Sequence, residues 1–237
     1  MDITEGIRLT WLGHSTFHAI SSANRIVLID PWIRENPSCP ADFKTFDRVD
    51  LILVTHGHYD HIADAPRLAI EHGATVVSNY ETSVWLESKG VKNAVGMNKG
   101  GTYVFHGIQV TMVPADHSCG ILDDGKIIYG GEPCGFVVRF ENGIKIYHAG
   151  DTNVFGDMKI IGDLYRPDVA ILPIGGHYTM GPREAALACR LLGVRSVIPM
   201  HFGTFPALSG TPAQLRELTR DITDFEVIEA EIGRIVA

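Results

Sequence analysis

Six consecutive residues, His56-Gly57-His58-Tyr59-Asp60-His61, follow directly after the apolar run 51–55. They offer three imidazoles and one carboxylate as potential metal ligands. Imidazole nitrogens bind Zn²⁺ and related divalent ions, and a carboxylate adds a harder, negatively charged ligand. We expect the glycine to let the backbone turn as it leaves a strand, so that the side chains around it converge. The motif predicts a metal site, and a histidine-rich surface loop is the alternative that it leaves open by itself.

The 237-residue chain has the composition of an ordinary globular protein, with 45% hydrophobic and 20% charged residues. Its formal net charge of −8 argues against a nucleic-acid partner, which would need a basic face. A small anionic substrate is not excluded, because bound metal ions would dominate the local field. No apolar run reaches the roughly 18–20 residues of a membrane span. Because segment 1–6 lacks the features of a signal peptide, we expect a cytoplasmic protein with no membrane partner.

The four cysteines are scattered along the chain without C-x-x-C pairing. Since no secretory signal is evident, we expect no disulfide bonds. Cys119 stands two residues after His117 and could approach a metal site. A small, buried structural thiol is the interpretation that we favour for it.

Strand-like and helical stretches alternate along the chain without a long linker. The predicted strands cover residues 7–20, 25–30, 51–55, 75–78, 102–106, 108–114, 136–140, 144–148, 169–174, 196–200 and 225–236. The predicted helices cover residues 63–72, 81–89, 182–192 and 212–221. Each half of the chain, about 1–115 and 135–237, has the pattern of a mixed sheet with helices on one face. We therefore predict a single α/β domain over residues 1–237, with the two halves packed sheet against sheet.

Several apolar runs end at a histidine or an aspartate. In α/β proteins, sites are built in the crevice beyond the carboxyl ends of strands. If these strands share one edge, seven potential ligands converge there. The sequence pattern therefore predicts one composite site rather than several separate ones.

The ordered series His56, His58, Asp60, His61, His117, Asp151 and His201 resembles the complete ligand set of the metallo-β-lactamase superfamily, with Asp151 inside a Gly-Asp-Thr segment. The resemblance spans essentially the whole chain. Shorter segments are similar to the prokaryotic metal-dependent hydrolases related to L-ascorbate-6-phosphate lactonase. These segments are Trp11-Leu12-Gly13-His14-Ser15, Gly131-Glu132-Pro133, Tyr147-His148-Ala149-Gly150-Asp151-Thr152, Leu172-Pro173-Ile174-Gly175 and Pro199-Met200-His201. The resemblance implies a four-layer αββα sandwich, with two mixed sheets face to face and helices outside.

The resemblance also implies two divalent metal ions per chain, with a bridging hydroxide as nucleophile. The first ion would be held by His56, His58 and His117, the second by Asp60, His61 and His201, and Asp151 would bridge them. Asp60 and Asp151 would thus belong to the catalytic centre. Flavin-linked diiron members carry glutamate where this chain has His58, so zinc is favoured, with Mn²⁺ or Fe²⁺ as alternatives. Asp151 argues against a true β-lactamase, because that subgroup lacks the bridging carboxylate.

Three further histidines are candidates for the site. His177, which follows two glycines, is predicted to be a catalytic residue that donates to a substrate oxyanion. His14 could orient a ligand, contact the substrate or be structural, and His148 could support a ligand by a hydrogen bond. The glycine-rich segment 119–135 could form either a mobile flap or a plain surface hairpin.

The predicted activity is cleavage of an ester, lactone or phosphoester in a small-molecule substrate. A non-catalytic metal-binding or sensing protein on the same fold is the alternative. A phosphodiesterase that acts on a lipid or a nucleotide is a further alternative. A homo-oligomer stays open, because members of the superfamily form dimers or larger assemblies.

Overall fold

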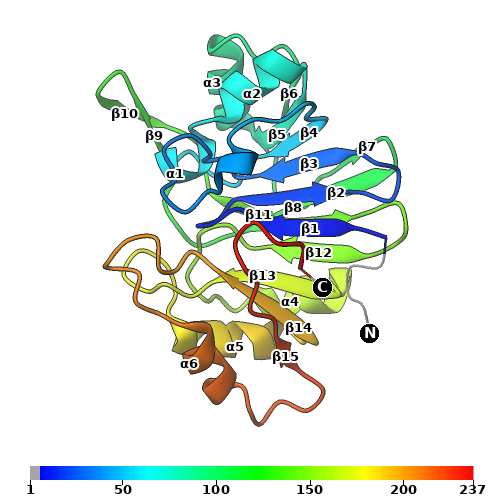
Figure 1. Cartoon of the computed structure of the whole chain (residues 1–237), viewed down its shortest axis with the longest axis vertical. Coiled ribbons are helices and arrows are strands. Elements are labelled where there is room, and N and C mark those ends of the chain that lie inside the picture. Colours follow the sequence, from blue (N-terminus) through cyan, green and yellow to red (C-terminus); the bar gives the residue numbers. More distant parts are fainter. Residues whose placement is uncertain (1–5, 237) are drawn as a thin grey trace.

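The computed structural model describes residues 6–236 (Figure 1). Residues 1–5 and residue 237 lie outside the described range. The expectation about a signal peptide was based mostly on residues 1–5. Within residues 6–236, no helix has the length and apolar character needed to cross a membrane.

The first sheet is built from the N-terminal part of the chain. Its strands, in spatial order, are β1 (Arg8–Trp11), β2 (Phe17–Ile20), β3 (Ile26–Ile29), β4 (Leu51–Leu53), β5 (Thr75–Asn79) and β6 (Ala94–Met97). The pairing is antiparallel from β1 to β3 and parallel from β3 to β6. Helices α2 (Ala65–His72) and α3 (Tyr80–Ser88) cover its outer face, where Leu68 and Leu86 are completely buried.

The second sheet repeats this plan. In spatial order it contains β15 (Glu226–Val227), β14 (Ser196–Met200), β13 (Val169–Pro173), β12 (Lys145–His148), β11 (Cys134–Arg139), β8 (Ile108–Pro114) and β7 (Thr102–Phe105). Helices α4 (Met158–Tyr165), α5 (Pro182–Leu192) and α6 (Pro212–Leu218) pack on its outer face. Because β8 pairs with β11 and β7 pairs with β8, the border between the two sheets falls between residues 97 and 102 rather than near 115.

A large apolar cluster fills the space between the sheets. Alternation along β4 shows how one strand serves two layers: Leu51 and Leu53 belong to this inner cluster, whereas Ile52 belongs to the cluster beneath α2 and α3. Successive side chains of a strand point to opposite faces, so a strand covered on both sides must be apolar throughout. The predicted four-layer αββα sandwich is thereby confirmed (Figure 1).

Two predicted strands were wrong. Residues 7–20 form a hairpin instead of one strand, because the chain reverses at Gly13 (φ +90°) and His14 (φ +55°). The N–H of Leu12 donates to the carbonyl of Thr16 at 2.9 Å and closes this turn. The predicted strand 225–236 is mostly irregular, with only β15 and an isolated bridge from Ile235 to Thr10.

Several short elements escaped prediction, and α4 shows why. Gly162 lies in the interior of this helix, and an interior glycine is a weak helix signal. A Cβ at Gly162 would collide with the carbonyl oxygen of Leu192 at the end of α5. The glycine is therefore required by the close approach of two helices, which only the tertiary structure reveals.

Candidate metal centre

One edge of the two sheets gathers all seven predicted ligands. Each follows the carboxyl end of β4, β8, β12 or β14, and these four strands end at this edge. The first four come from the segment after β4 and from the single-turn helix α1 (Tyr59–Ile62). The other three, His117, Asp151 and His201, follow β8, β12 and β14.

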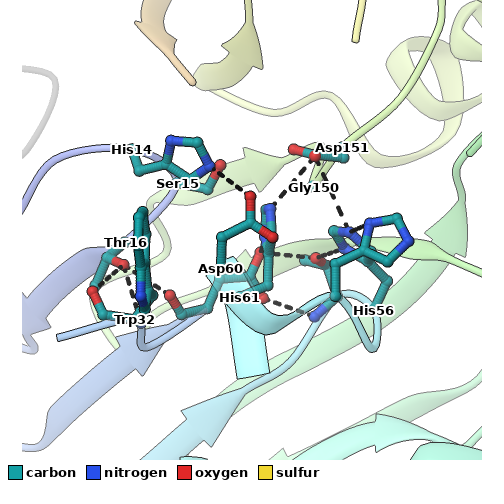
Figure 2. A network of polar contacts seen from close by, with 12 residues as sticks. His14, Ser15, Thr16, Trp32, His56, Asp60, His61, Gly150 and Asp151 are labelled. Atoms are coloured by element: carbon teal, nitrogen blue, oxygen red, sulfur yellow. Dashed lines mark hydrogen bonds and ion pairs between the residues drawn. The ribbon is translucent and has the colours of Figure 1, made fainter. Parts of the chain in front are cut away.

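Asp151 lies at the middle of this group. Its Oδ2 atom is 3.0 Å from Nε2 of His201 and 3.3 Å from Nε2 of His61. The same oxygen is 3.7 Å from Nε2 of His117 and 4.0 Å from Nε2 of His56. Figure 2 shows the carboxylate of Asp151 facing His61 and His56. One carboxylate oxygen is therefore shared by imidazoles from both predicted metal sites.

Potential ligand atoms form three groups with spacing suited to a metal ion. One of them, Asp30 with His56 and His61, contains residues from both predicted sites, and the other two are clusters that divide six of the predicted ligands between them. In the first cluster, the potential ligand atoms of His56, His58 and His117 lie within 4.8 Å of one another. In the second, those of Asp60, His61, His201 and His14 satisfy the same limit. The division between the clusters matches the two predicted sites, with His14 added to the second.

Several buried polar atoms at the centre lack a hydrogen-bond partner among the described residues. Oδ1 of Asp151 has none, and Nε2 of His61 and Nε2 of His201 lie close to Oδ2 of Asp151 without the geometry of a hydrogen bond. A buried polar atom without a partner costs free energy. A divalent ion bound by nitrogen and oxygen atoms would satisfy these groups, and the donor set suits Zn²⁺ and chemically related ions. The residues present therefore fit a metal centre.

The electrostatics of the first cluster and of Asp151 also suit metal binding. Burial lowers the pKa of His56, His58 and His117, so these imidazoles stay neutral with a lone pair available. Burial alone would raise the pKa of Asp151, but the neighbouring His201 and His61 outweigh it and hold that pKa well below its usual range. The shared carboxylate is therefore ionised.

Comparison with known proteins identifies the family. Residues 25–202 match the β-lactamase superfamily domain. The chain belongs to the metallo-β-lactamase superfamily. It is 53% identical over 217 residues to the UPF0173 metal-dependent hydrolase of Koribacter versatilis, covering 92% of this chain and 93% of that protein. The UPF0173 protein of Solibacter usitatus is 53% identical over 230 residues, covering 97% and 99% of the two chains.

A solved structure gives the same result. Igni18, a metallo hydrolase from Ignicoccus hospitalis, superposes with a TM-score of 0.81 at 35% identity, covering 98% of this chain and 96% of Igni18. The resemblance to the metal-dependent hydrolases is confirmed, and the chain is a metal-dependent hydrolase of this superfamily. The closer relation to L-ascorbate-6-phosphate lactonase stays a prediction.

A carboxylate that the sequence analysis missed supports the hydrolase's second cluster. Asp30 follows β3, and its Oδ2 atom lies 2.8 Å from Nδ1 of His61. Asp30 also accepts hydrogen bonds from the backbone N–H (2.8 Å) and the hydroxyl (2.7 Å) of Thr55. Because Nδ1–H of His61 donates to Asp30, its Nε2 is left to face the metal site. The only sequence signal was a lone aspartate that ends the apolar run 26–29.

His14 orients Asp60. Its Nε2 atom lies 2.9 Å from Oδ2 of Asp60 (Figure 2). Its Nδ1 atom lies 3.1 Å from the hydroxyl of Thr204. Burial lowers the pKa of His14 to about 4, so the neutral ring donates through Nε2–H and accepts at Nδ1. Burial opposes charge on Asp60, yet the hydrogen bond from His14 and the proximity of His61 bring its pKa to about 2. Of the roles considered for His14, orientation of a ligand fits the structure.

His148 holds the turn that carries Asp151. The buried ring donates from Nε2 to the carbonyl of Ser15 (3.1 Å) and accepts at Nδ1 from the N–H of Gly150 (3.2 Å). Gly150 has φ +63°, and a Cβ there would lie 2.8 Å from the carbonyl oxygen of Cys134. His148 therefore supports a ligand through the backbone rather than through the ligand's side chain.

His177 lies apart from the two ligand clusters. Its side chain is exposed, and its ring contacts that of Tyr178 with centroids 4.4 Å apart. Tyr178 lines the cleft above the metal centre, whereas His177 is not among its lining residues. The predicted catalytic role of His177 stays a prediction.

Gly57 is needed for a different reason from the one expected. Its φ is not in the left-handed region, so the chain does not depend on it for a special turn. Instead, a Cβ at Gly57 would collide with Cγ1 of Ile121. Cys119 packs beside it as a buried thiol, with Sγ 3.3 Å from the N–H of Gly57 and 3.1 Å from the carbonyl of Gly130. Cys119 is therefore structural, as favoured from the sequence.

The glycine-rich segment contains a projecting hairpin formed by β9 (Gly120–Asp123) and β10 (Lys126–Tyr129) (Figure 1). Together with the loop that contains Phe205 and Pro206, this hairpin borders a cleft of about 970 Å³. The floor of the cleft includes Asp151 and His201. A small molecule that enters the cleft would therefore meet the candidate metal ligands.

Proposed function

We propose that the hydrolase binds two zinc ions and cleaves an ester, lactone or phosphoester of a small molecule. The observation that carries this proposal is the position of Asp151 Oδ2, which lies within 4.0 Å of imidazole nitrogens from both ligand clusters. A carboxylate shared in this way suits a pair of ions better than one ion. The neutral imidazole at His58 favours zinc, with Mn²⁺ and Fe²⁺ as the other candidates.

Each residue has a distinct part in the proposed reaction. When bound, the ions supply an activated hydroxide at neutral pH and polarise the substrate oxygen. His56, His58 and His117 would hold one ion, Asp60, His61 and His201 the other, and Asp151 would bind both. Asp30 and His14 would keep His61 and Asp60 in the required orientation. His177 does not line the cleft, so the predicted hydrogen bond from it to the substrate oxyanion would require its loop to move toward the metal centre.

The alternative is a metal-binding or sensing protein without catalysis. It needs the ligands but not an open substrate cleft, and the cleft over Asp151 and His201 favours the enzyme. The same cleft suits a small-molecule substrate better than a nucleic acid, for which a protein with a net charge of −8 is poorly suited.

The deciding experiment compares zinc-reconstituted wild type with Asp151→Ala and Asp151→Asn. Metal content per chain and turnover of lactones, thioesters, β-lactams and phosphodiesters are measured in the same samples. We expect about two ions in the wild type, and in both variants fewer ions and activity reduced by about 100-fold or more. Asp163→Ala, which removes an exposed carboxylate on α4, serves as the control and should change neither quantity. Full activity with two ions in Asp151→Ala would refute the dinuclear proposal.

A further inference from the structure

The walls of the cleft are largely apolar and lack lysine and arginine side chains. Leu122 and Ile127 border it on one side, and Phe205 and Pro206 border it on another. Among the described residues that line the cleft, none is lysine or arginine. Outside the metal centre, a substrate in this cleft would therefore find apolar contacts and no positively charged partner.

Leu122 and Ile127 form one face of the β9–β10 hairpin. They are directly opposite each other in the strand register, so their side chains lie on the same face. Their exposed fractions are 62% and 80%, which is high for large apolar side chains beside a site. Gly120 belongs to the same face, and a Cβ there would lie 2.9 Å from Cγ2 of Ile127. The face is therefore an uncovered apolar surface at the cleft.

The opposite face of the hairpin is fixed to the body of the protein. Ile121 is 1% exposed and packs against Gly57. Asp123 accepts hydrogen bonds from Nε1 of Trp85 at 2.9 Å and from Nζ of Lys89 at 2.6 Å. These contacts hold the hairpin beside the metal centre. The apolar face is therefore a positioned wall of the cleft.

The lysines near this wall do not supply a free positive charge to the cleft. Lys89 is paired with Asp123 on the anchored face, and Lys99 is paired with Glu132 at 2.6 Å. Lys126 precedes Ile127 in β10, so its side chain points to the opposite face of the hairpin. An anionic group remote from the scissile bond would lose hydration at this wall without gaining an ionic partner.

We propose that the substrate carries an uncharged alkyl or aryl group next to the scissile bond, and that Leu122 and Ile127 bind this group. The inference rests on the proposed hydrolase function and specifies its substrate class. The reacting group itself would bind at the metal centre, whereas a second phosphate or carboxylate elsewhere in the molecule would weaken binding. Neutral esters and lactones with an apolar substituent are thus favoured over phosphorylated sugar derivatives.

Hydroxamic acids test this proposal without turnover, because their common head group binds zinc while the tail can be varied. Dissociation constants of acetohydroxamic acid, octanohydroxamic acid and succinic monohydroxamic acid are measured by calorimetry on the zinc-loaded protein. We expect the octanoyl compound to bind at least about tenfold more tightly than the acetyl compound, because its longer tail buries apolar surface. The succinyl compound, whose tail ends in a carboxylate, should bind no more tightly than the acetyl compound.

Leu122→Arg tests the assignment of the wall. The variant should bind the octanoyl compound at least about fivefold more weakly than wild type and the succinyl compound more tightly, because it exchanges an apolar contact for a cation. Val104→Arg is the matched control, since Val104 is 58% exposed on β7 and does not line the cleft. It should leave all three dissociation constants unchanged.

The two proposals fail in different ways. Equal affinities for the three tails, or no effect of Leu122→Arg, would overturn the apolar-wall proposal and leave the metal centre intact. If no hydroxamate bound, both proposals would be overturned, and the zinc content of the sample would show whether the metal centre itself was at fault.

Discussion

Asp30 Oδ2 lies 2.8 Å from Nδ1 of His61, and both side chains are completely buried. The two residues follow parallel neighbouring strands: Asp30 comes directly after β3, and His61 lies in α1, shortly after β4. Burial opposes charge on His61, yet Asp151 and Asp30 outweigh burial and raise the pKa of His61 well above its ordinary value. The imidazole is therefore held between two carboxylates, one on each ring nitrogen.

Asp30→Asn should weaken metal binding by about 10–100-fold, because the amide no longer fixes the orientation and tautomer of His61. Competition with a chromophoric chelator measures the affinity. Asp64→Asn is a matched control: Asp64 is also buried and accepts two backbone hydrogen bonds, from Ile33 and Arg34, outside the ligand clusters. The control should lose stability without losing metal affinity. Equal metal affinities of Asp30→Asn and wild type would contradict the role given to Asp30.

Two substitutions of His14 should show whether its role is to orient Asp60 by a hydrogen bond or only to fill space. His14→Leu removes the hydrogen bond to Asp60 and should lower metal occupancy and turnover by about tenfold or more. His14→Gln retains an N–H donor at a similar distance from the backbone and should recover part of both losses. Metal content and steady-state rates of the two variants provide the comparison. If leucine and glutamine had the same effect, packing rather than the hydrogen bond would be the role of His14.

Gly57→Ala should destabilise the fold by about 1–3 kcal/mol, because the added methyl collides with Ile121. Urea denaturation gives the free energy of unfolding. In the double variant Gly57→Ala/Ile121→Ala the collision is absent, so the combined loss should be smaller than the sum of the single losses by about 1 kcal/mol or more. Strict additivity would show that the two residues do not interact as described.

Stability should fall at mildly acidic pH because of His18, which lies away from the metal centre. This side chain is 8% exposed, and its ring centroid lies 5.6 Å from that of Phe43 and 5.7 Å from that of Phe46. Burial, aided by the positive charge of Arg8, lowers its pKa from 6.5 to about 4. The unfolded chain therefore takes up a proton near pH 6.5, whereas the folded protein does so only near pH 4.

The contribution of His18 is complete above pH 6.5 and is lost as the pH falls toward 4. The expected loss is on the order of 2–3 kcal/mol. His18→Gln cannot titrate, so its free energy of unfolding should decline less between pH 7 and pH 4.5 than that of wild type. Denaturant titrations of both proteins across this range provide the measurement. Parallel declines would exclude His18 as the cause.

Much of the candidate site could be predicted because the ligands mark the ends of apolar strands. His56, His58, Asp60 and His61 are close in sequence, and a short segment cannot place them far apart. His117, Asp151 and His201 could be added because each follows an apolar run, and parallel strands bring such ends to one edge. The αββα layers followed from the alternation of strands and helices together with the family resemblance.

The parts that escaped prediction depend on contacts between distant segments. The aspartate at position 30 looks like any aspartate after a strand until α1 brings His61 to it. The hairpin in residues 7–20 depends on positive φ angles at Gly13 and His14, and the second of these is not a glycine. Helix α4 was missed because Gly162 has a low helix propensity. The reason for a glycine there is its close contact with Leu192, which the sequence does not show.

The two faces of the β9–β10 hairpin have a consequence for how this family can diverge. Ile121 and Asp123 hold the hairpin to the body, whereas Leu122 and Ile127 line the cleft. Mutations at the latter two positions can alter selectivity while the ligands and the anchoring contacts are inherited unchanged. A gene duplicate could thus acquire a new substrate through single substitutions on one exposed face, with the chemistry preserved throughout.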